Sequence, residues 1–189
     1  MLRLATILLL IVGALGVTGC APLVVGGAAA GTAVANDKRS LGTVVDDSVI
    51  KMKAEAAITA RPALKENTHV DATSINRIVL LTGEARTRGD LDRVLTIVRT
   101  IPGVRKVINQ IRVAPPSSFG ARLTDTWITV RVKTALLAHD LNANRIKVVT
   151  ADRVVYLMGL VTRATAQAAA GVASRVPNVR SVVELFQYL

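Results

Sequence analysis

The sequence after Val45 is an internal repeat, and this feature limits the possible folds more than any other. Three short motifs occur twice, in the same order. They are Asp47-Ser-Val-Ile50 and Asp125-Thr-Trp-Ile128, Arg77-Ile-Val-Leu-Leu-Thr-Gly83 and Arg153-Val-Val-Tyr-Leu-Met-Gly159, and Ile101-Pro-Gly-Val104 and Val176-Pro-Asn-Val179. The separation between equivalent motifs falls only from 78 to 76 to 75 residues, as small loop deletions would produce. The chain is therefore expected to contain two small domains of the same fold.

Each copy has the pattern helix, strand, strand, helix, strand. In the first copy the expected elements are a helix over 47–59, strands over 68–74 and 77–82, a second helix, and a strand over 104–113. In the second copy they are a helix from residue 125, strands over 146–150 and 153–158, a helix over 165–175, and a strand over 179–188. A tight hairpin is antiparallel, whereas a strand–helix–strand crossover is parallel and right-handed. The prediction is an α+β fold: two tandem three-stranded mixed sheets, each with both helices on one face.

Residue spacing also assigns roles within these elements. Asp47 and Asp125 are expected to cap the opening helices, and Asp46 belongs to the same helix start. The first hairpin is expected to turn at Ile75-Asn76, and Gly83 and Gly159 to end strands. Side chains expected to face the core are Ile50, Ala54, Ala57 and Ile58; Leu91, Val94, Leu95 and Val98; and Ala169, Ala170 and Ala173.

The opening helix of the second copy has two apolar sides. Ile128, Val132, Ala135 and Leu136 form a core-facing stripe, and Trp127, Val130, Thr134 and Leu137 lie nearly opposite, flanked by Arg131 and Lys133. An exposed Trp among aliphatic and cationic residues is typical of a helix at a membrane interface. A second interpretation remains open, in which this side packs on another domain of the same chain.

The opening helix of the first copy differs on the same side. Its equivalent residues are Val49, Met52, Ala56 and Thr59, and Glu55 replaces Lys133. It therefore lacks both the interfacial aromatic ring and a purely cationic flank. Membrane adaptation is expected in the second copy alone.

The first 19 residues have the pattern of a signal peptide with a short apolar core. The core ends at Val17-Thr18-Gly19-Cys20, which resembles the lipobox of bacterial lipoproteins. The resemblance implies cleavage before Cys20, a diacylglycerol on its sulfur and acylation of the new amino terminus. In that family an Asp directly after the Cys is the usual signal for retention at the inner membrane. Ala21 and Pro22 follow here instead, so the resemblance favours the outer membrane, facing the periplasm. Residues 20–45 would then form a Gly/Ala-rich tether.

Charge and composition narrow the possible partners. The formal net charge is +11, which indicates an anionic partner, while aromatic residues make up only 3% and disfavour a stacking platform for single-stranded nucleic acid. Six cations of the first copy (Arg86, Arg88, Arg93, Arg99, Arg105 and Lys106) are interpreted as solvated surface. Nucleic acid is therefore not expected as a partner.

Enzymatic chemistry finds no support in the residue pattern. A single Cys and two His, His69 and His139, are too few and too scattered for a zinc site. The chain has no nucleophile motif and no phosphate-binding loop. The sequence therefore predicts a non-enzymatic protein without cofactor, metal or small-molecule substrate.

The repeat resembles the BON domain, which has an opening Asp-x-x-Ile helix, a Gly after the second strand, an Ala/Val-rich helix and a Val-x-x-Val ending. The domains are placed at 46–113 and 124–189, with a linker over 114–123. With the lipobox, the chain resembles dual-BON outer-membrane lipoproteins. This resemblance implies binding of anionic phospholipid by the second domain, a role in outer-membrane integrity, enrichment at the division site and association with outer-membrane protein assembly machinery. The alternative is a periplasmic protein-interaction scaffold that uses the Trp127 face.

Overall fold

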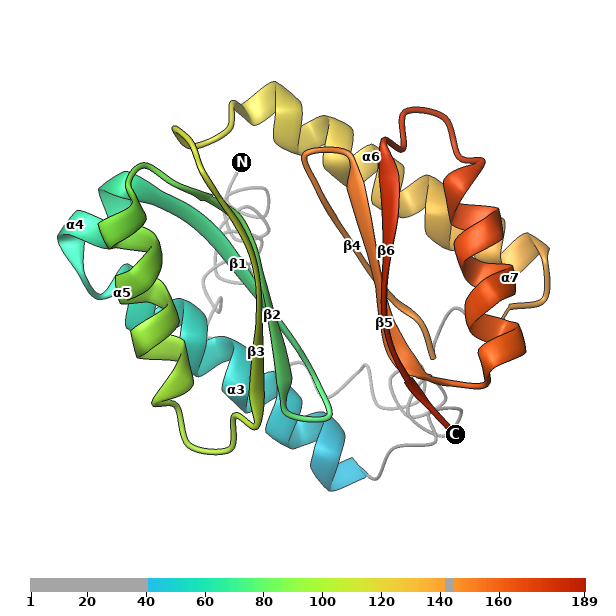
Figure 1. Ribbon diagram of the computed structural model, residues 1–189, viewed down its shortest axis with the longest axis horizontal. Coiled ribbons are helices and arrows are strands. Elements are labelled where there is room, and N and C mark those ends of the chain that lie inside the picture. The colour runs from blue at the N-terminus through green and yellow to red at the C-terminus, as the bar shows by residue number, and fades with distance from the viewer. Residues whose placement is uncertain (1–40, 142–144) are drawn as a thin grey trace, which may run out of the picture. The chain divides into compact units, whose positions relative to one another are not determined.

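The computed structural model describes residues 41–141 and 145–189 (Figure 1). The predicted signal peptide, Cys20 and most of the predicted tether lie outside the described residues. The first repeat comprises α3 (Leu41–Thr59), α4 (Pro62–Asn67), β1 (Thr68–Ile75), β2 (Ile78–Ala85), α5 (Arg88–Arg99) and β3 (Lys106–Val113). The second comprises α6 (Phe119–Ala138), β4 (Lys147–Ala151), β5 (Val154–Val161), α7 (Arg163–Ser174) and β6 (Ser181–Tyr188).

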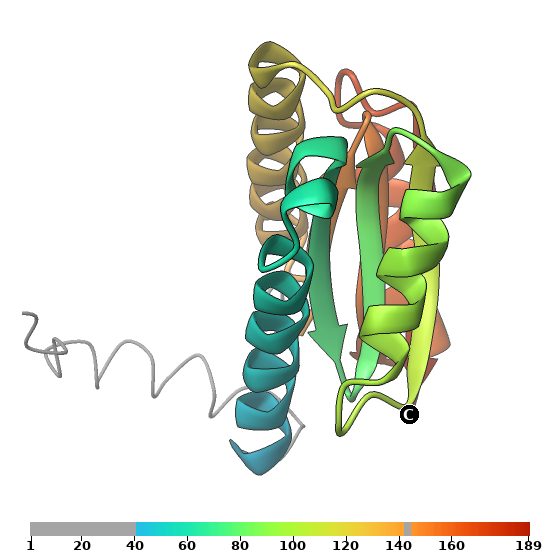
Figure 2. The ribbon, with the colours of Figure 1, turned by 90° about the vertical axis from the view of Figure 1, so that its left-hand side faces the viewer.

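Each repeat forms a three-stranded mixed sheet with its central strand second in sequence. In the first sheet β2 pairs antiparallel with β1 and parallel with β3, and in the second β5 pairs in the same way with β4 and β6. The helices of each repeat cover one face of its own sheet (Figures 1 and 2). The predicted fold class, two tandem α+β units with mixed sheets, is confirmed.

The helices bury the side chains that the spacing selects. Ile50, Ala54 and Ile58 of α3, together with the apolar stripe of α5, form the core of the first repeat. Ile128, Val132 and Leu136 of α6 pack with Ala166, Ala169 and Ala173 of α7 in the second. Ala57 and Ala170 are half-buried at the margins of these cores.

The short helix α4 was not predicted. It begins at Pro62, a residue favoured in the first turn because that turn needs no N–H donor there. Leu64 is its only buried residue and joins the core of the first repeat. Six residues are too few for a helical period to stand out in the sequence.

The prediction that Asp47 and Asp125 cap the opening helices is wrong. Both helices begin six residues earlier, and α6 is capped by Ser118, whose hydroxyl accepts a hydrogen bond from the Ala121 N–H at 3.3 Å. The Asp125 carboxylate instead accepts the backbone N–H groups of Asp152 and Arg153, each at 2.8 Å. Each aspartate therefore joins the interior of a helix to the hairpin turn of the adjacent sheet.

The first repeat makes the same connection more deeply. Asp47 is 5% exposed and accepts the N–H groups of Asn76 and Arg77 at 2.8 Å and the Ser74 hydroxyl at 2.7 Å. The turn is Asn76-Arg77, one residue later than predicted, and both residues have positive φ angles, 52° and 63°. This conformation costs energy in a residue other than Gly. The carboxylate offsets that cost by accepting both turn donors.

Gly83 and Gly159 lie inside β2 and β5, so the prediction that they end strands is also wrong. A Cβ atom added to Gly83 would lie 1.9 Å from the carbonyl oxygen of His69, and one added to Gly159 would lie 2.2 Å from that of Arg145. Glycine is required at both positions because the neighbouring backbone approaches so closely.

A third apolar cluster draws on the sheet residues of both repeats, which belong to one compact unit. Its buried members are Ile75 and Leu80 of the first sheet and Tyr156 and Met158 of the second. The Asn76 side-chain amide donates to the Gln187 carbonyl at 3.1 Å beside them. The sheet faces that the helices leave free are therefore covered by contact between the repeats.

The two neighbouring acids at the start of the first repeat test the carboxylate–turn connection. Replacing Asp47 with Ala leaves two turn N–H groups and a buried hydroxyl without their acceptor, and should lower the free energy of unfolding by about 3 kcal/mol. The matched change Asp46→Ala removes an exposed ion pair with Arg77 and should cost less than about 1 kcal/mol. Urea denaturation followed by circular dichroism measures both. Equal losses would show that the Asp47 contacts do not stabilise the fold.

Tyr156 makes the contact between the repeats sensitive to alkali. Burial raises the pKa of its phenol above the ordinary value, although Arg112 and Arg180 act in the opposite direction. The folded protein therefore holds the proton more tightly than the unfolded chain, and stability should fall as pH rises through and above about 10. Denaturation of the wild type and of Tyr156→Phe at about pH 8 and pH 10.5 should show a larger loss for the wild type. An equal loss would contradict this.

Candidate functional site

The outward side of α6 carries a continuous apolar stripe. Large side chains exposed along this 20-residue helix are Phe119, Leu123, Trp127, Val130 and Leu137. At 1.5 Å per residue the helix is about 30 Å long. The opposite side is closed, since Ile128, Val132 and Leu136 are at most 1% exposed. A stripe of this kind on a folded domain is typical of an interaction surface.

Trp127 is 63% exposed, and this bears on one of the two interpretations left open by the sequence. Its side of α6 is not buried against the first repeat or against any other described part of the chain. The hypothesis of internal packing is therefore wrong for this face. All six predicted site residues (Trp127, Val130, Arg131, Lys133, Thr134 and Leu137) lie exposed on α6.

The cations lie on the two flanks of the stripe. The Arg131 guanidinium stacks over the Trp127 ring at 5.3 Å from its centroid, so the ring and the charge are held together. Lys133 lies on the opposite flank with Leu137. The structure therefore divides the predicted set: Trp127, Val130, Arg131 and Thr134 turn toward α7, whereas Lys133 and Leu137 do not line that side.

Sequence reasoning missed part of this surface. Phe119 and Leu123 were assigned to the linker, yet they extend the stripe by two helical turns. Their four-residue spacing from each other and from Trp127 was a usable signal. Val172, Arg175, Val176 and Pro177, at the end of α7 and just after it, border the same side and were not among the predicted site residues.

The first repeat presents a weaker version of the same side. Val45, Val49 and Met52 of α3 are exposed at positions equivalent to Leu123, Trp127 and Val130. Lys51 pairs with Glu55 at 3.7 Å, and this acid occupies the place of Lys133. The aromatic ring and the uniformly positive flank are thus confined to the second repeat.

Comparison with known proteins identifies the repeat. A BON domain model matches residues 46–115 and 124–189. The chain belongs to the BON domain family. It is 34% identical to the outer membrane lipoprotein DolP of Haemophilus influenzae, over 90% of this chain and 89% of that protein. It is also 33% identical to a 21 kDa hemolysin of Actinobacillus pleuropneumoniae (81% and 79% covered) and 30% identical to osmotically-inducible protein Y of Escherichia coli (81% and 78% covered).

Within residues 41–141 and 145–189, no three His, Cys, Asp or Glu side chains are grouped so as to hold a metal ion. In the same residues, no helix combines the length and hydrophobicity needed to cross a bilayer.

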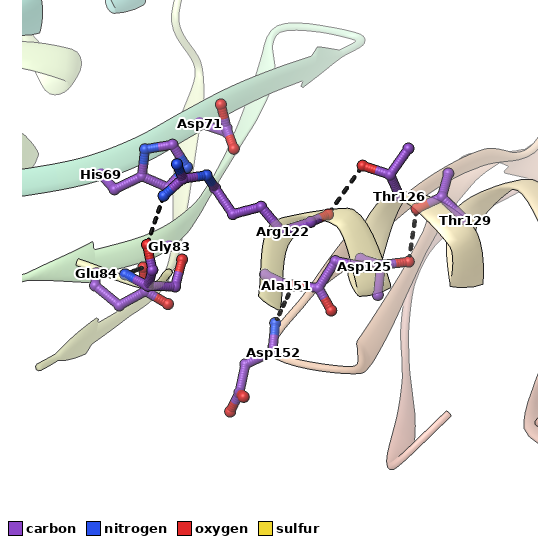
Figure 3. Close-up of a pocket in the computed structure, with 12 residues that line it drawn as sticks. His69, Asp71, Gly83, Glu84, Arg122, Asp125, Thr126, Thr129, Ala151 and Asp152 are labelled. Carbon is purple, nitrogen blue, oxygen red and sulfur yellow. Dashed lines mark hydrogen bonds between the residues drawn. The ribbon is translucent and has the colours of Figure 1, made fainter. Parts of the chain in front are cut away.

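A polar pocket lies where the two BON domains meet (Figure 3). Arg122 extends from α6 toward His69 and Glu84, and its guanidinium donates to the Ser117 carbonyl. The Ser117 N–H donates to Glu84, which is only 3% exposed. Arg112 donates to Glu84 at 2.9 Å and to Asp152 at 2.8 Å. The pocket therefore rests on an ion network that joins the linker and both BON domains.

Arg112 should stabilise this junction more than its exposure suggests. Replacing it with Ala leaves the buried Glu84 carboxylate without its cation and should lower the free energy of unfolding by about 2 kcal/mol. Arg180→Ala, which removes only the exposed contact with Asp152, should cost less than about 1 kcal/mol. Adding Glu84→Gln to Arg112→Ala should recover part of the loss in urea denaturation. Absence of recovery would contradict this role for the buried carboxylate.

Proposed function

We propose that this protein is a non-enzymatic lipoprotein of the outer membrane, facing the periplasm, that binds anionic phospholipid through α6 of its second BON domain. The observation that carries the proposal is the exposed Trp127 in an apolar stripe between Arg131 and Lys133. The resemblance of Val17-Thr18-Gly19-Cys20 to a lipobox and the similarity to an outer membrane lipoprotein support the location. Support of outer-membrane integrity is the role that we propose for this binding.

The physical chemistry of α6 suits the boundary between head groups and acyl chains. Trp favours this depth because its ring is apolar and its N–H remains hydrated. Each Lys or Arg near an anionic surface contributes on the order of 1 kcal/mol. The aliphatic members of the stripe add to this when they leave water, at about 25 cal/mol per Å² of apolar surface. The helix therefore combines hydrophobic and electrostatic contributions on one side.

A lipid anchor would make even weak binding by α6 effective. Acyl chains on Cys20 would hold the protein at the membrane and convert the second contact into an intramolecular one. A chain from Cys20 to Leu41 can reach at most about 75 Å. The helix would then bind and release according to local lipid charge, without loss of the protein from the membrane.

A docking face for outer-membrane protein assembly machinery is the rival hypothesis, and it uses the same residues. Enrichment at the division site likewise stays a prediction. The two hypotheses differ in how binding depends on lipid charge. A face that docks a protein is not expected to enter an anionic bilayer in preference to a neutral one.

Trp127 is the only Trp of the chain, so its fluorescence reports the position of α6. The full lipidated protein is reconstituted in zwitterionic vesicles with or without anionic phospholipid, all with an equal fraction of phospholipid brominated on its acyl chains. Quenching should be stronger in the anionic vesicles and should weaken at high salt, because screening reduces the attraction. The lipid anchor is present in every sample, so its contribution to membrane binding is the same in both vesicle types.

Matched variants identify the helix responsible. Lys133→Glu should reduce the extra quenching in anionic vesicles. Lys53 of α3 is an exposed cation at the position equivalent to Arg131, and Lys53→Glu should leave the quenching unchanged. Equal quenching in both vesicle types, unaltered by Lys133→Glu, would refute phospholipid binding by α6. Loss of a captured envelope protein with Lys133→Glu would then favour the rival.

A further inference from the structure

A groove runs between α6 and the C-terminal end of α7, beside the stripe. Its α6 wall consists of Trp127, Val130, Arg131, Thr134, Ala135, Ala138 and His139. The opposite wall consists of Val172, Arg175, Val176 and Pro177. Both helices lie on the same face of the second sheet (Figure 1). The groove is therefore a feature of the second BON domain alone and does not depend on the contact between the domains.

Small side chains make the groove open and apolar. Ala135, Ala138 and Val172 stand where the two helices approach, while the neighbouring Leu136 and Ala173 are fully buried beneath them. The walls extend from Trp127 to His139, about 18 Å along the helix at 1.5 Å per residue. Half of the hydrocarbon core of a bilayer is about 15 Å. The length of the groove thus fits one extended acyl chain.

Two guanidinium groups line this apolar groove. Arg131 is held on the Trp127 ring, and Arg175 is the exposed C-cap residue of α7. Within residues 41–141 and 145–189 neither cation forms an ion pair, and none of the described lining residues carries a carboxylate. An apolar groove with unpaired cations is complementary to an amphiphile with an anionic head group.

We infer that the groove binds a single anionic phospholipid, with one acyl chain along Ala135, Ala138 and Val172 and the phosphate between Arg131 and Arg175. The inference rests on the proposed function and adds a defined site to it. A helix that only lies in the interface needs no contribution from α7 and has no fixed stoichiometry. A groove requires Arg175 and takes one lipid for each protein.

The first BON domain lacks the corresponding groups. Thr100 stands at the position of Arg175, and the larger Ile97 stands at the position of Val172. Val49 replaces the Trp127 ring on which Arg131 stacks. One of the two cations and the aromatic wall are therefore absent there, so a second equivalent site is not expected.

The full lipidated protein, held in zwitterionic detergent micelles, provides the test. It is titrated with phosphatidylglycerol brominated on its acyl chains, and Trp127 fluorescence is followed. Quenching should saturate at one lipid per protein, and brominated phosphatidylcholine should bind more weakly. Quenching that rises without saturation would overturn the inference.

Filling the groove distinguishes it from general insertion into the interface. Ala138→Phe adds apolar surface at an exposed position and should strengthen insertion into a bilayer. The same change blocks the proposed groove and should weaken binding of the single lipid in micelles. Ala168→Phe, at an exposed position of α7 outside the groove, should leave that binding unaltered. Binding as tight or tighter with Ala138→Phe would overturn the groove.

Charge reversal on α7 provides the second variant. Arg175→Glu should weaken phosphatidylglycerol binding in micelles roughly tenfold, because it replaces attraction of the phosphate by repulsion. Arg99→Glu, in the last turn of the equivalent helix α5, should have no effect. Circular dichroism confirms that each variant is folded.

If these changes have no effect while anionic vesicles still quench Trp127 preferentially, the groove is refuted and the proposed function stands. If both signals are absent, both are refuted.

Discussion

The bond between a helix-interior aspartate and a hairpin turn sets the geometry of each BON domain. Asp47 and Asp125 accept paired backbone N–H groups whose residues have positive φ angles, so the turn and the helix stabilise each other. The bond fixes the helix on its sheet in both position and rotation. Once Asp125 faces the turn, Ile128, Val132 and Leu136 must face the core. The rotation that buries them is the same rotation that leaves Trp127 outside.

The repeat and its periodicity were sufficient to predict the fold. Apolar residues at helical spacing selected the buried sides of α3, α5 and α6, and the order of elements gave the mixed sheets. The helix starts could not be found in this way. An aspartate ahead of an apolar stripe suits both a cap and a turn bond, and the apolar residues in the first six positions of α6, Phe119 and Leu123, lie on the outward side and not among the core positions.

The contact between the domains did leave a signal in the sequence. The runs Val79-Leu80-Leu81 and Val155-Tyr156-Leu157-Met158 do not alternate with polar residues, which indicates strands covered on both faces. Helices on one face leave the other to be covered, and the second repeat is the available partner. The groove had no such signal, because the alanines near α7 are equally typical of a tightly packed core. Only coordinates separate a small residue that closes an interface from one that leaves space.

The two domains show how one scaffold carries different surfaces. The turn bonds and the core positions occur in both, whereas the opening helix carries Glu55 in one copy and Lys133 in the other at a position outside the core. An exposed substitution has little effect on stability, so these positions are free to differ in charge and hydrophobicity. The Arg112 network and the shared apolar cluster then join both domains into one unit. The α6 stripe is therefore presented by a body of two domains rather than by a single small one. Because α6 is already folded on its own sheet, little conformational entropy would be lost when the stripe meets a surface, and this favours binding.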